Sequence, residues 1–204
     1  MKSLLVIFLS IFLSCQINLQ AVQPNHPLMQ TGRINCAKEI QEDLLAIYRV
    51  PEGKVLIDTI LNEGSLKIIV KKTSVSEQFG AYWDPDTRTI CLAVAAKQNE
   101  CITGALLFEL HNALVTSKID QLDDLASKRQ LNRASYVESM EYLEYVNSLN
   151  ASKIAEKGIQ MGILDQEARL PTYPSFKEHF HMQKISGHSA HFSRNYDRLA
   201  QRYL

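Results

Sequence analysis

Residues 79–114 read FGAYWDPDTRTICLAVAAKQNECITGALLFELHNAL, and this stretch decides which fold the chain can adopt. Two runs suited to β-strands, residues 79–83 and 87–93, flank the turn residues Asp84-Pro85-Asp86. Strand-like runs on either side of such a turn predict a β-hairpin. Residues 102–115 follow, and their nearly continuous apolar character predicts a buried helix. The stretch therefore combines a hairpin with a buried helix that comes soon after it.

Apolar periodicity predicts further elements on both sides of this stretch. On the N-terminal side we expect an amphipathic helix over residues 34–49 and strands over residues 55–61 and 66–70. On the C-terminal side we expect only helices, over residues 135–149, 153–164 and 176–203, the last of them broken near Gly187. This order predicts an α+β fold, in which a small mixed or antiparallel sheet of three to four strands packs on helices and the C-terminal half is helical.

The N-terminus has the layout of a secretory signal. Lys2 precedes an apolar run at residues 4–13, and small or polar residues follow that run. The run is about half as long as a membrane-spanning helix, which needs ~20 apolar residues. We expect cleavage after Ala21 and export to the periplasm, envelope or medium; an alternative is lipid attachment at Cys15. The expected organisation is a signal peptide at 1–21, a linker at 22–32 and one domain at 33–204.

The net charge of the chain limits the classes of partner that it can bind. The chain has 22 Lys and Arg and 22 Asp and Glu, so its formal net charge is zero. This balance gives no electrostatic basis for binding nucleic acid. No second long apolar run predicts a transmembrane segment in the mature chain.

Cys36, Cys91 and Cys101 remain after the signal. They could form one disulfide and leave one free thiol, or all three could stay unpaired, and the sequence leaves both alternatives open. No Cys and His spacing predicts a zinc site, and we expect no cofactor.

The hairpin and the helix together resemble the zincin metallopeptidases in their local layout. Those enzymes carry His-Glu-Leu-x-His-Ala on the active-site helix, and an edge strand beside the cleft often precedes it. In this chain the corresponding segments are Phe108-Glu109-Leu110-His111-Asn112-Ala113 and Tyr82–Leu92. The resemblance implies a zincin-like fold in which Glu109 stands at the position of the catalytic glutamate.

The two zinc-binding histidines of that family are replaced in this chain by Phe108 and Asn112. A phenyl ring cannot bind a metal, and an amide is a poor zinc ligand. His111 does not substitute for them, because its side chain is rotated ~100° from that of the next residue. The resemblance therefore implies a protein without the zinc site and without catalysis, which acts by binding. We expect an unknown peptide or protein to lie along the strand Thr87–Ala93 as an edge strand.

A later helix supplies the third ligand in zincins of the glutamate type, and three glutamates lie on one here. We expect Glu138, Glu141 and Glu144 to form a solvated face. One alternative function is a metal-dependent hydrolase in which His111 and one of these carboxylates hold the ion. Another is a non-catalytic envelope or secreted structural protein without zincin ancestry. The expected core stripe of the same helix is Tyr136, Met140 and Leu143.

Four of the six histidines lie close together near the C-terminus. We expect a mixture of surface and core residues, and a metal site or a pH-responsive surface is the alternative. These histidines are His179, His181, His188 and His191.

Glu109 needs a partner if no metal is present, because a buried carboxylate without one is costly. We expect it to accept a hydrogen bond from Arg88, from Tyr82 or from a backbone amide of the strand region, and so to tie the helix to that region. Asn112, one turn further along, can share this network through its amide.

Overall fold

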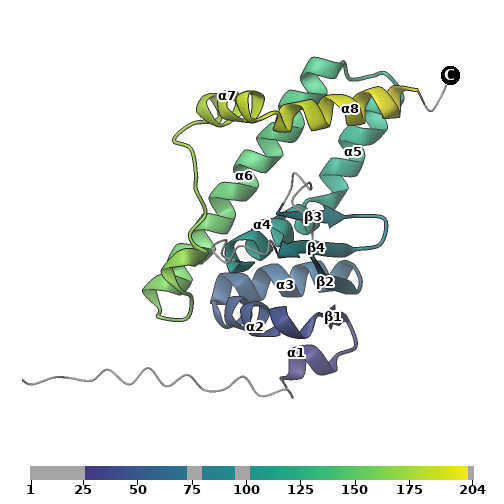
Figure 1. Ribbon diagram of the computed structural model, residues 1–204. Coiled ribbons are helices and arrows are strands. Elements are labelled where there is room, and N and C mark those ends of the chain that lie inside the picture. Colours follow the sequence, from purple (N-terminus) through teal and green to yellow (C-terminus); the bar gives the residue numbers. More distant parts are fainter. Residues whose placement is uncertain (1–25, 73–79, 95–101, 202–204) are drawn as a thin grey trace, which may run out of the picture.

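The computed structural model describes residues 26–72, 80–94 and 102–201, so the expected signal peptide, residues 22–25 of the expected linker and Cys101 lie outside the described residues. The described chain forms a four-stranded mixed sheet, eight α-helices and two short 3-10 helices (Figure 1). The predicted α+β class and the helical C-terminal half are confirmed. No described helix is both long and apolar enough to cross a bilayer.

The sheet has the strand order β1-β2-β4-β3. β1 (Ile34–Cys36), β2 (Leu66–Lys72) and β4 (Thr89–Val94) run parallel to one another, and β3 (Ala81–Asp84) runs antiparallel to β4. β3 and β4 are the two strands of the predicted hairpin, which is confirmed. β3 lies at the edge of the sheet that faces the upper helices α5 to α8 (Figure 1).

The expectation of a free edge along Thr87–Ala93 is wrong. β4 covers most of that segment and is internal, because it pairs with β2 on one side and with β3 on the other. A strand whose two sides are both paired has no backbone groups left for a third strand. Among the described strands, the edges of the sheet are β1 and β3, and β3 is the edge strand next to β4.

The N-terminal part corrects two further predictions. Its helices are α1 (Pro27–Gln30), the 3-10 helix η1 (Lys38–Ile40), α2 (Gln41–Arg49) and α3 (Pro51–Glu63). The expected helix over residues 34–49 in fact begins as β1, in which Ile34 and Cys36 are buried and Asn35 is exposed.

The segment expected as a strand over residues 55–61 lies within α3. Its buried residues Leu56, Ile57, Ile60 and Leu61 recur at helical spacing, and that spacing outweighs the strand preference of the β-branched residues. Pro51 begins this helix, at a position where its missing N–H is not needed.

The predicted C-terminal helices are confirmed, although two predicted segments form one helix and α5 was not predicted. α4 follows the sheet, the long α6 covers the predicted segments 135–149 and most of 153–164, and Gly187, with φ of 84°, separates α7 from α8. The bounds are α4 (Ile102–Leu114), α5 (Thr116–Ser127), α6 (Arg133–Gln160), the 3-10 helix η2 (Gln166–Ala168), α7 (Phe176–Ser186) and α8 (His188–Ala200).

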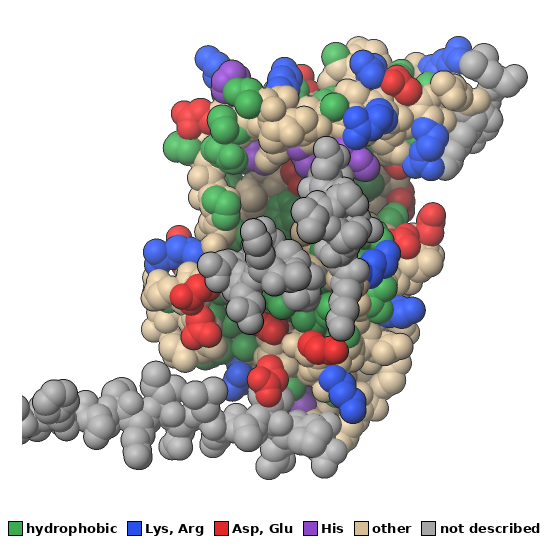
Figure 2. Space-filling model, in the orientation of Figure 1, with side chains coloured by type: hydrophobic (Ala, Val, Ile, Leu, Met, Phe, Trp, Pro, Cys, Tyr) green, Lys and Arg blue, Asp and Glu red, His purple; other side chains and the backbone are tan. Residues whose placement is uncertain are grey.

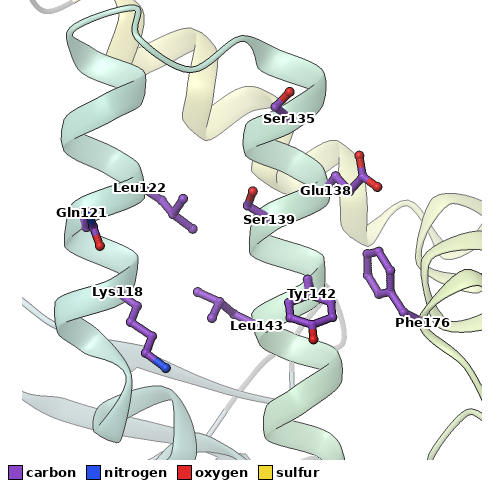
Figure 3. Close-up of a pocket in the computed structure, with 9 residues that line it drawn as sticks. All are labelled: Lys118, Gln121, Leu122, Ser135, Glu138, Ser139, Tyr142, Leu143 and Phe176. Atoms are coloured by element: carbon purple, nitrogen blue, oxygen red, sulfur yellow. The ribbon is translucent and has the colours of Figure 1, made fainter.

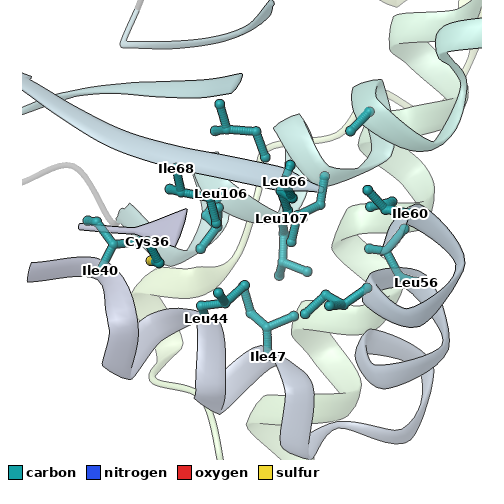
Figure 4. Packing of buried hydrophobic residues seen from close by; sticks show 14 of the residues in the cluster. Cys36, Ile40, Leu44, Ile47, Leu56, Ile60, Leu66, Ile68, Leu106 and Leu107 are labelled. Atoms are coloured by element: carbon teal, nitrogen blue, oxygen red, sulfur yellow. The ribbon is translucent and has the colours of Figure 1, made fainter. Parts of the chain in front are cut away.

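Two hydrophobic clusters hold these elements together. The larger one joins α2, α3, the sheet and α4, with Leu44, Ile47, Ile68 and Leu107 among the residues that meet at its centre (Figure 4). The smaller one joins α5, α6 and α8 around Tyr136. α6 contributes to both clusters, so it fixes the α7–α8 pair relative to α4 and the sheet (Figure 1).

Candidate functional site

Glu109 lies on the face of α4 that meets the hairpin. Its residue surface is 4 % exposed, and it accepts hydrogen bonds from Asn112 Nδ2, at 3.0 Å, and from the backbone N–H of Trp83 in β3. The expected bond to a backbone amide of the strand region is therefore present, and so is the expected contribution of Asn112. The other two candidate donors are engaged elsewhere, since Arg88 bonds the carbonyls of residues 60 and 65 and Tyr82 accepts from Lys71.

A second amide extends this network from α4 to α6. Asn147 donates from Nδ2 to Asn112 Oδ1 at 2.8 Å, and both side chains are buried. Sequence reasoning missed Asn147. A signal was present, because Asn147 lies at i+7 from Met140 and at i−4 from Ala151, in a stripe of buried positions along α6. A polar residue in such a stripe requires a buried hydrogen-bond partner.

The neighbours of Glu109 on α4 do not form a metal site. Phe108 is half-buried, and His111 is buried with Nδ1 2.8 Å from the carbonyl oxygen of Leu107. Burial lowers the pKa of His111, which favours a neutral ring. His111 has no hydrogen bond or ion pair with the glutamates of α6. In the part of the chain that the structure describes, no three His, Cys, Asp or Glu side chains are arranged to hold a metal ion.

The glutamates of α6 do not form the solvated face that was expected. Glu138 is exposed, but Glu144 is half-buried and Glu141 is completely buried. Tyr136 and Met140 are buried as expected, while Leu143 is half-buried. The prediction failed because α7 and α8 pack over the face of α6 that carries Glu141 (Figure 1).

Glu141 is the point at which three helices meet. Its Oε1 accepts a hydrogen bond of 2.7 Å from the hydroxyl of Ser189 and lies 3.1 Å from His188 Nδ1. Its Oε2 lies 3.4 Å from His179 Nε2, an ion-pair contact that is not aligned as a hydrogen bond. Ser189 is a second residue that sequence reasoning missed, because nothing local in the sequence links it to α6.

The C-terminal histidines separate into two groups. His179 is buried and His188 is half-buried, and both face Glu141. His181 and His191 lie on exposed positions of α7 and α8. The expectation of a mixture of surface and core histidines is confirmed.

The ionisable groups around Glu141 influence one another. Burial raises the pKa of Glu109 to about 7, although Asn112, the Trp83 amide and His188 oppose the shift. Burial also raises the pKa of Glu144 to about 8, and the charges of Glu109 and Glu141 add to this shift. At neutral pH this group of carboxylates therefore holds protons that solvent-exposed glutamates would release.

Glu141 and His188 are both held in their charged forms, because they form a pair. Burial alone would raise the pKa of Glu141, but the contacts with His179, His188 and Ser189 outweigh it and lower the pKa to about 2. Burial acts to lower the pKa of His188, yet the three glutamates nearby raise it overall. Glu141 is thus an ionised carboxylate whose positive partner is His188.

The space-filling view shows a hollow beneath α7 and α8, with histidine side chains at its upper edge and acidic atoms inside it (Figure 2). A separate groove of about 530 Å³ lies between α5 and α6 beside Phe176 (Figure 3). Leu122, Tyr142 and Leu143 line this groove, but none of the buried ionisable groups does. The chemically distinctive site is therefore the buried cluster of Glu109, Glu141, Glu144, His179 and His188.

The two described cysteines, Cys36 and Cys91, are free and buried. They lie on β1 and β4, which β2 separates, so they stand about 9 Å or more apart given the ~4.8 Å spacing of neighbouring strands. That separation is too large for a disulfide, whose Cα atoms lie within ~7 Å.

Comparisons with known proteins found no match for this chain among protein-family models, curated proteins or solved structures.

Proposed function

We propose that this protein is an exported, zincin-like domain that lacks peptidase activity and binds a peptide or protein partner. One observation carries the proposal. Glu109, at the position of the family's catalytic glutamate, is buried and bonded to Asn112 and to the Trp83 amide. In a zinc peptidase the corresponding carboxylate must be free to polarise a metal-bound water. A glutamate engaged in this way supports binding rather than hydrolysis.

The arrangement around α4 supports the zincin-like part of the proposal. The helix packs against both β3 and β4, and the antiparallel strand β3 forms the edge of the sheet beside it. The structural-protein alternative would be favoured if α4 did not pack against the hairpin, and α4 does pack there. The hydrolase alternative requires His111 to approach a glutamate of α6, but His111 is bonded to the carbonyl of Leu107.

The free edge of β3 is the surface on which a partner strand would add. The backbone of Ala93 donates to Gly80, and residues of an antiparallel pair alternate between bonded and outward-facing backbone groups. Ala81 and Trp83 therefore turn their backbone groups outward. Because Glu109 takes the N–H of Trp83, Ala81 has the N–H that remains for a partner.

A peptide-selection experiment tests this binding mode. Random peptides displayed on phage are selected on the mature protein, and the enriched peptides are titrated against Ala81→Pro, which removes the outward N–H without breaking the ladder to β4. Glu138→Gln, at an exposed position of α6, is the matched control. We expect binding that weakens in Ala81→Pro and is unchanged in the control. A selection without enrichment, or peptides that bind Ala81→Pro as well as the parent, would contradict the proposal.

The zincin-like geometry is tested by rebuilding the metal site. Asn112 bonds Asn147, which lies one turn beyond Glu144 on α6, so position 112 and Glu144 face the same region. We expect the double variant Phe108→His, Asn112→His to bind one Zn²⁺ in calorimetry, and Glu144→Gln in that background to abolish the binding. A folded double variant without zinc binding would contradict a zincin-like arrangement of these two helices.

A further inference from the structure

One carboxylate holds the α7–α8 pair to α6. The side chain of Glu141 is 0 % exposed, and it contacts one residue of α7, His179, and two residues of α8, His188 and Ser189. A buried carboxylate loses its hydration, so these contacts must replace it. Any change in the charge of His188 therefore changes how firmly α7 and α8 are held.

His179 is enclosed by aromatic side chains beside Glu141. Its ring centroid lies 5.5 Å from that of Tyr145 and 5.5 Å from that of Tyr173, and it is stacked against Phe176. Among the described residues, neither ring nitrogen of His179 has a hydrogen bond, and Nε2 lies 3.4 Å from Glu141 Oε2.

The charged groups of every neighbouring helix bear on this contact. Glu109 from α4 and Glu144 from α6 act on His188 together with Glu141. On α8, burial lowers the pKa of His191, and the positive charges of His188, Arg194 and Arg198 lower it further. α5 contributes Asp123, which accepts a hydrogen bond from the hydroxyl of Tyr136 on α6.

We propose that the contact of Glu141 with His179, His188 and Ser189 is a pH-dependent clasp, which holds α7 and α8 against α6 in mildly acidic solution and loosens in alkaline solution. The clasp would control access to the hollow beneath these two helices (Figure 2). It depends only on the contacts among α4, α6, α7 and α8, and not on the proposed peptide binding.

The direction of the pH dependence follows from the pKa shifts of His188 and of the three glutamates. The pKa of His188 is raised in the fold, so its contribution is complete below its ordinary value of 6.5 and is lost as the pH rises through the raised value. Glu109 and Glu144, whose pKa values rise from 4.5 to about 7 and about 8, become charged over the same alkaline range and then repel Glu141. Glu141 itself stays ionised down to a pKa of about 2, so its contribution is lost only below pH 4.5.

Amide hydrogen exchange on the mature protein tests the clasp. Protection is followed by NMR between pH 5.5 and pH 8.5 and corrected for the intrinsic exchange rate at each pH. We expect protection in α7 and α8 to fall about tenfold or more over this range, since a shift of one pKa unit in a coupled group changes an equilibrium about tenfold. Amides of β2 and β4 report global unfolding, and we expect them to change less.

Three variants separate the clasp from a general loss of stability. His188→Gln removes the positive partner of Glu141, so protection in α7 and α8 should already be lower than in the parent at pH 5.5 and should fall less between pH 5.5 and pH 8.5. Glu141→Gln should lower protection at pH 5.5 and remove the pH dependence, while Glu138→Gln on the exposed side of α6 should behave like the parent. Protection in α7 and α8 that is independent of pH in the parent, or a fall in His188→Gln as large as in the parent, would overturn the proposal.

Discussion

Replacement of Glu109 by glutamine should stabilise the protein in alkaline solution. Burial raises the pKa of this carboxyl from 4.5 to about 7, so its ionisation above pH 7 opposes folding. A shift of that size corresponds to about 3 kcal/mol of unfolding free energy at high pH, because one unit is about 1.4 kcal/mol. The penalty is absent below pH 4.5, where the carboxyl is protonated in both the folded and the unfolded chain.

Glutamine keeps the shape of the side chain and removes the charge. Its single carbonyl oxygen can accept from Asn112 or from the Trp83 amide, so one of the two bonds weakens at a cost of about 1 kcal/mol. We therefore expect Glu109→Gln to be about 2 kcal/mol more stable than the parent at pH 8.5 and about 1 kcal/mol less stable at pH 4.5. Glu109→Ala leaves both donors without an acceptor, and at pH 4.5 it should lose about 1.5 to 3 kcal/mol.

Urea unfolding at the two pH values measures both effects, and the fluorescence of Trp83, the only tryptophan of the chain, follows the transition. Glu138→Gln, at an exposed position, serves as the control and should match the parent at each pH. If Glu109→Gln shows the same pH dependence as the parent, Glu109 is not the buried titrating group described here. If it is destabilised equally at both pH values, its hydrogen bonds outweigh its charge and the reasoning fails.

Three further changes test the packing that positions the site, and equilibrium unfolding measures each of them. Asn147→Ala leaves Asn112 Oδ1 without its donor and should cost about 1 to 3 kcal/mol, whereas Asn150→Ala, at a half-buried position of the same helix, should cost less. Gly53→Ala places a Cβ 2.2 Å from the carbonyl oxygen of Ile47 and should cost about 1 to 3 kcal/mol, with Val55→Ala at an exposed position as its control. Tyr136→Phe removes a hydroxyl that donates to Asp123 and accepts from Asn195, so it should cost about 1 to 2 kcal/mol, while Tyr142→Phe, which is 52 % exposed, should have little effect. A control that loses as much as its partner variant would show that the hydrogen bond or close contact is not the cause.

The elements that sequence predicted correctly are those with strong local signals. The hairpin has turn residues between two strand-like runs, α4 is a long apolar segment, and Gly187 adopts a positive φ between α7 and α8. The failure at residues 55–61 has the opposite origin. A short run rich in β-branched residues fits a strand and a buried helix equally well, and only packing against α2 and α4 decides between them.

In the candidate site, too, the sequence predicted the local contacts correctly but not the contacts between distant segments. The bonds of Glu109 to Asn112 and to a strand amide were predictable because the hairpin and α4 are close in sequence and a buried carboxylate needs donors. The burial of Glu141 was not predictable, because its partners lie 38 to 48 residues away on helices whose docking no local pattern specifies. Its spacing from Glu138 and Glu144 fits an exposed face just as well.

The unequal protonation of the three buried or half-buried glutamates gives the site its chemical character. Glu141 is ionised because two histidines and a serine surround it, whereas burial raises the pKa of both Glu109 and Glu144, and the charges of Glu109 and Glu141 raise that of Glu144 further. Apolar side chains could fill this space without such penalties, so the cluster is a poor solution for stability alone. Perturbed carboxylates beside a hollow are instead typical of sites that exchange protons or meet charged groups. The free-energy penalty of burying these ionisable groups is concentrated where α4 and α6 face the α7–α8 pair. The protonation and packing of this part of the molecule should therefore change most between pH 5 and pH 9.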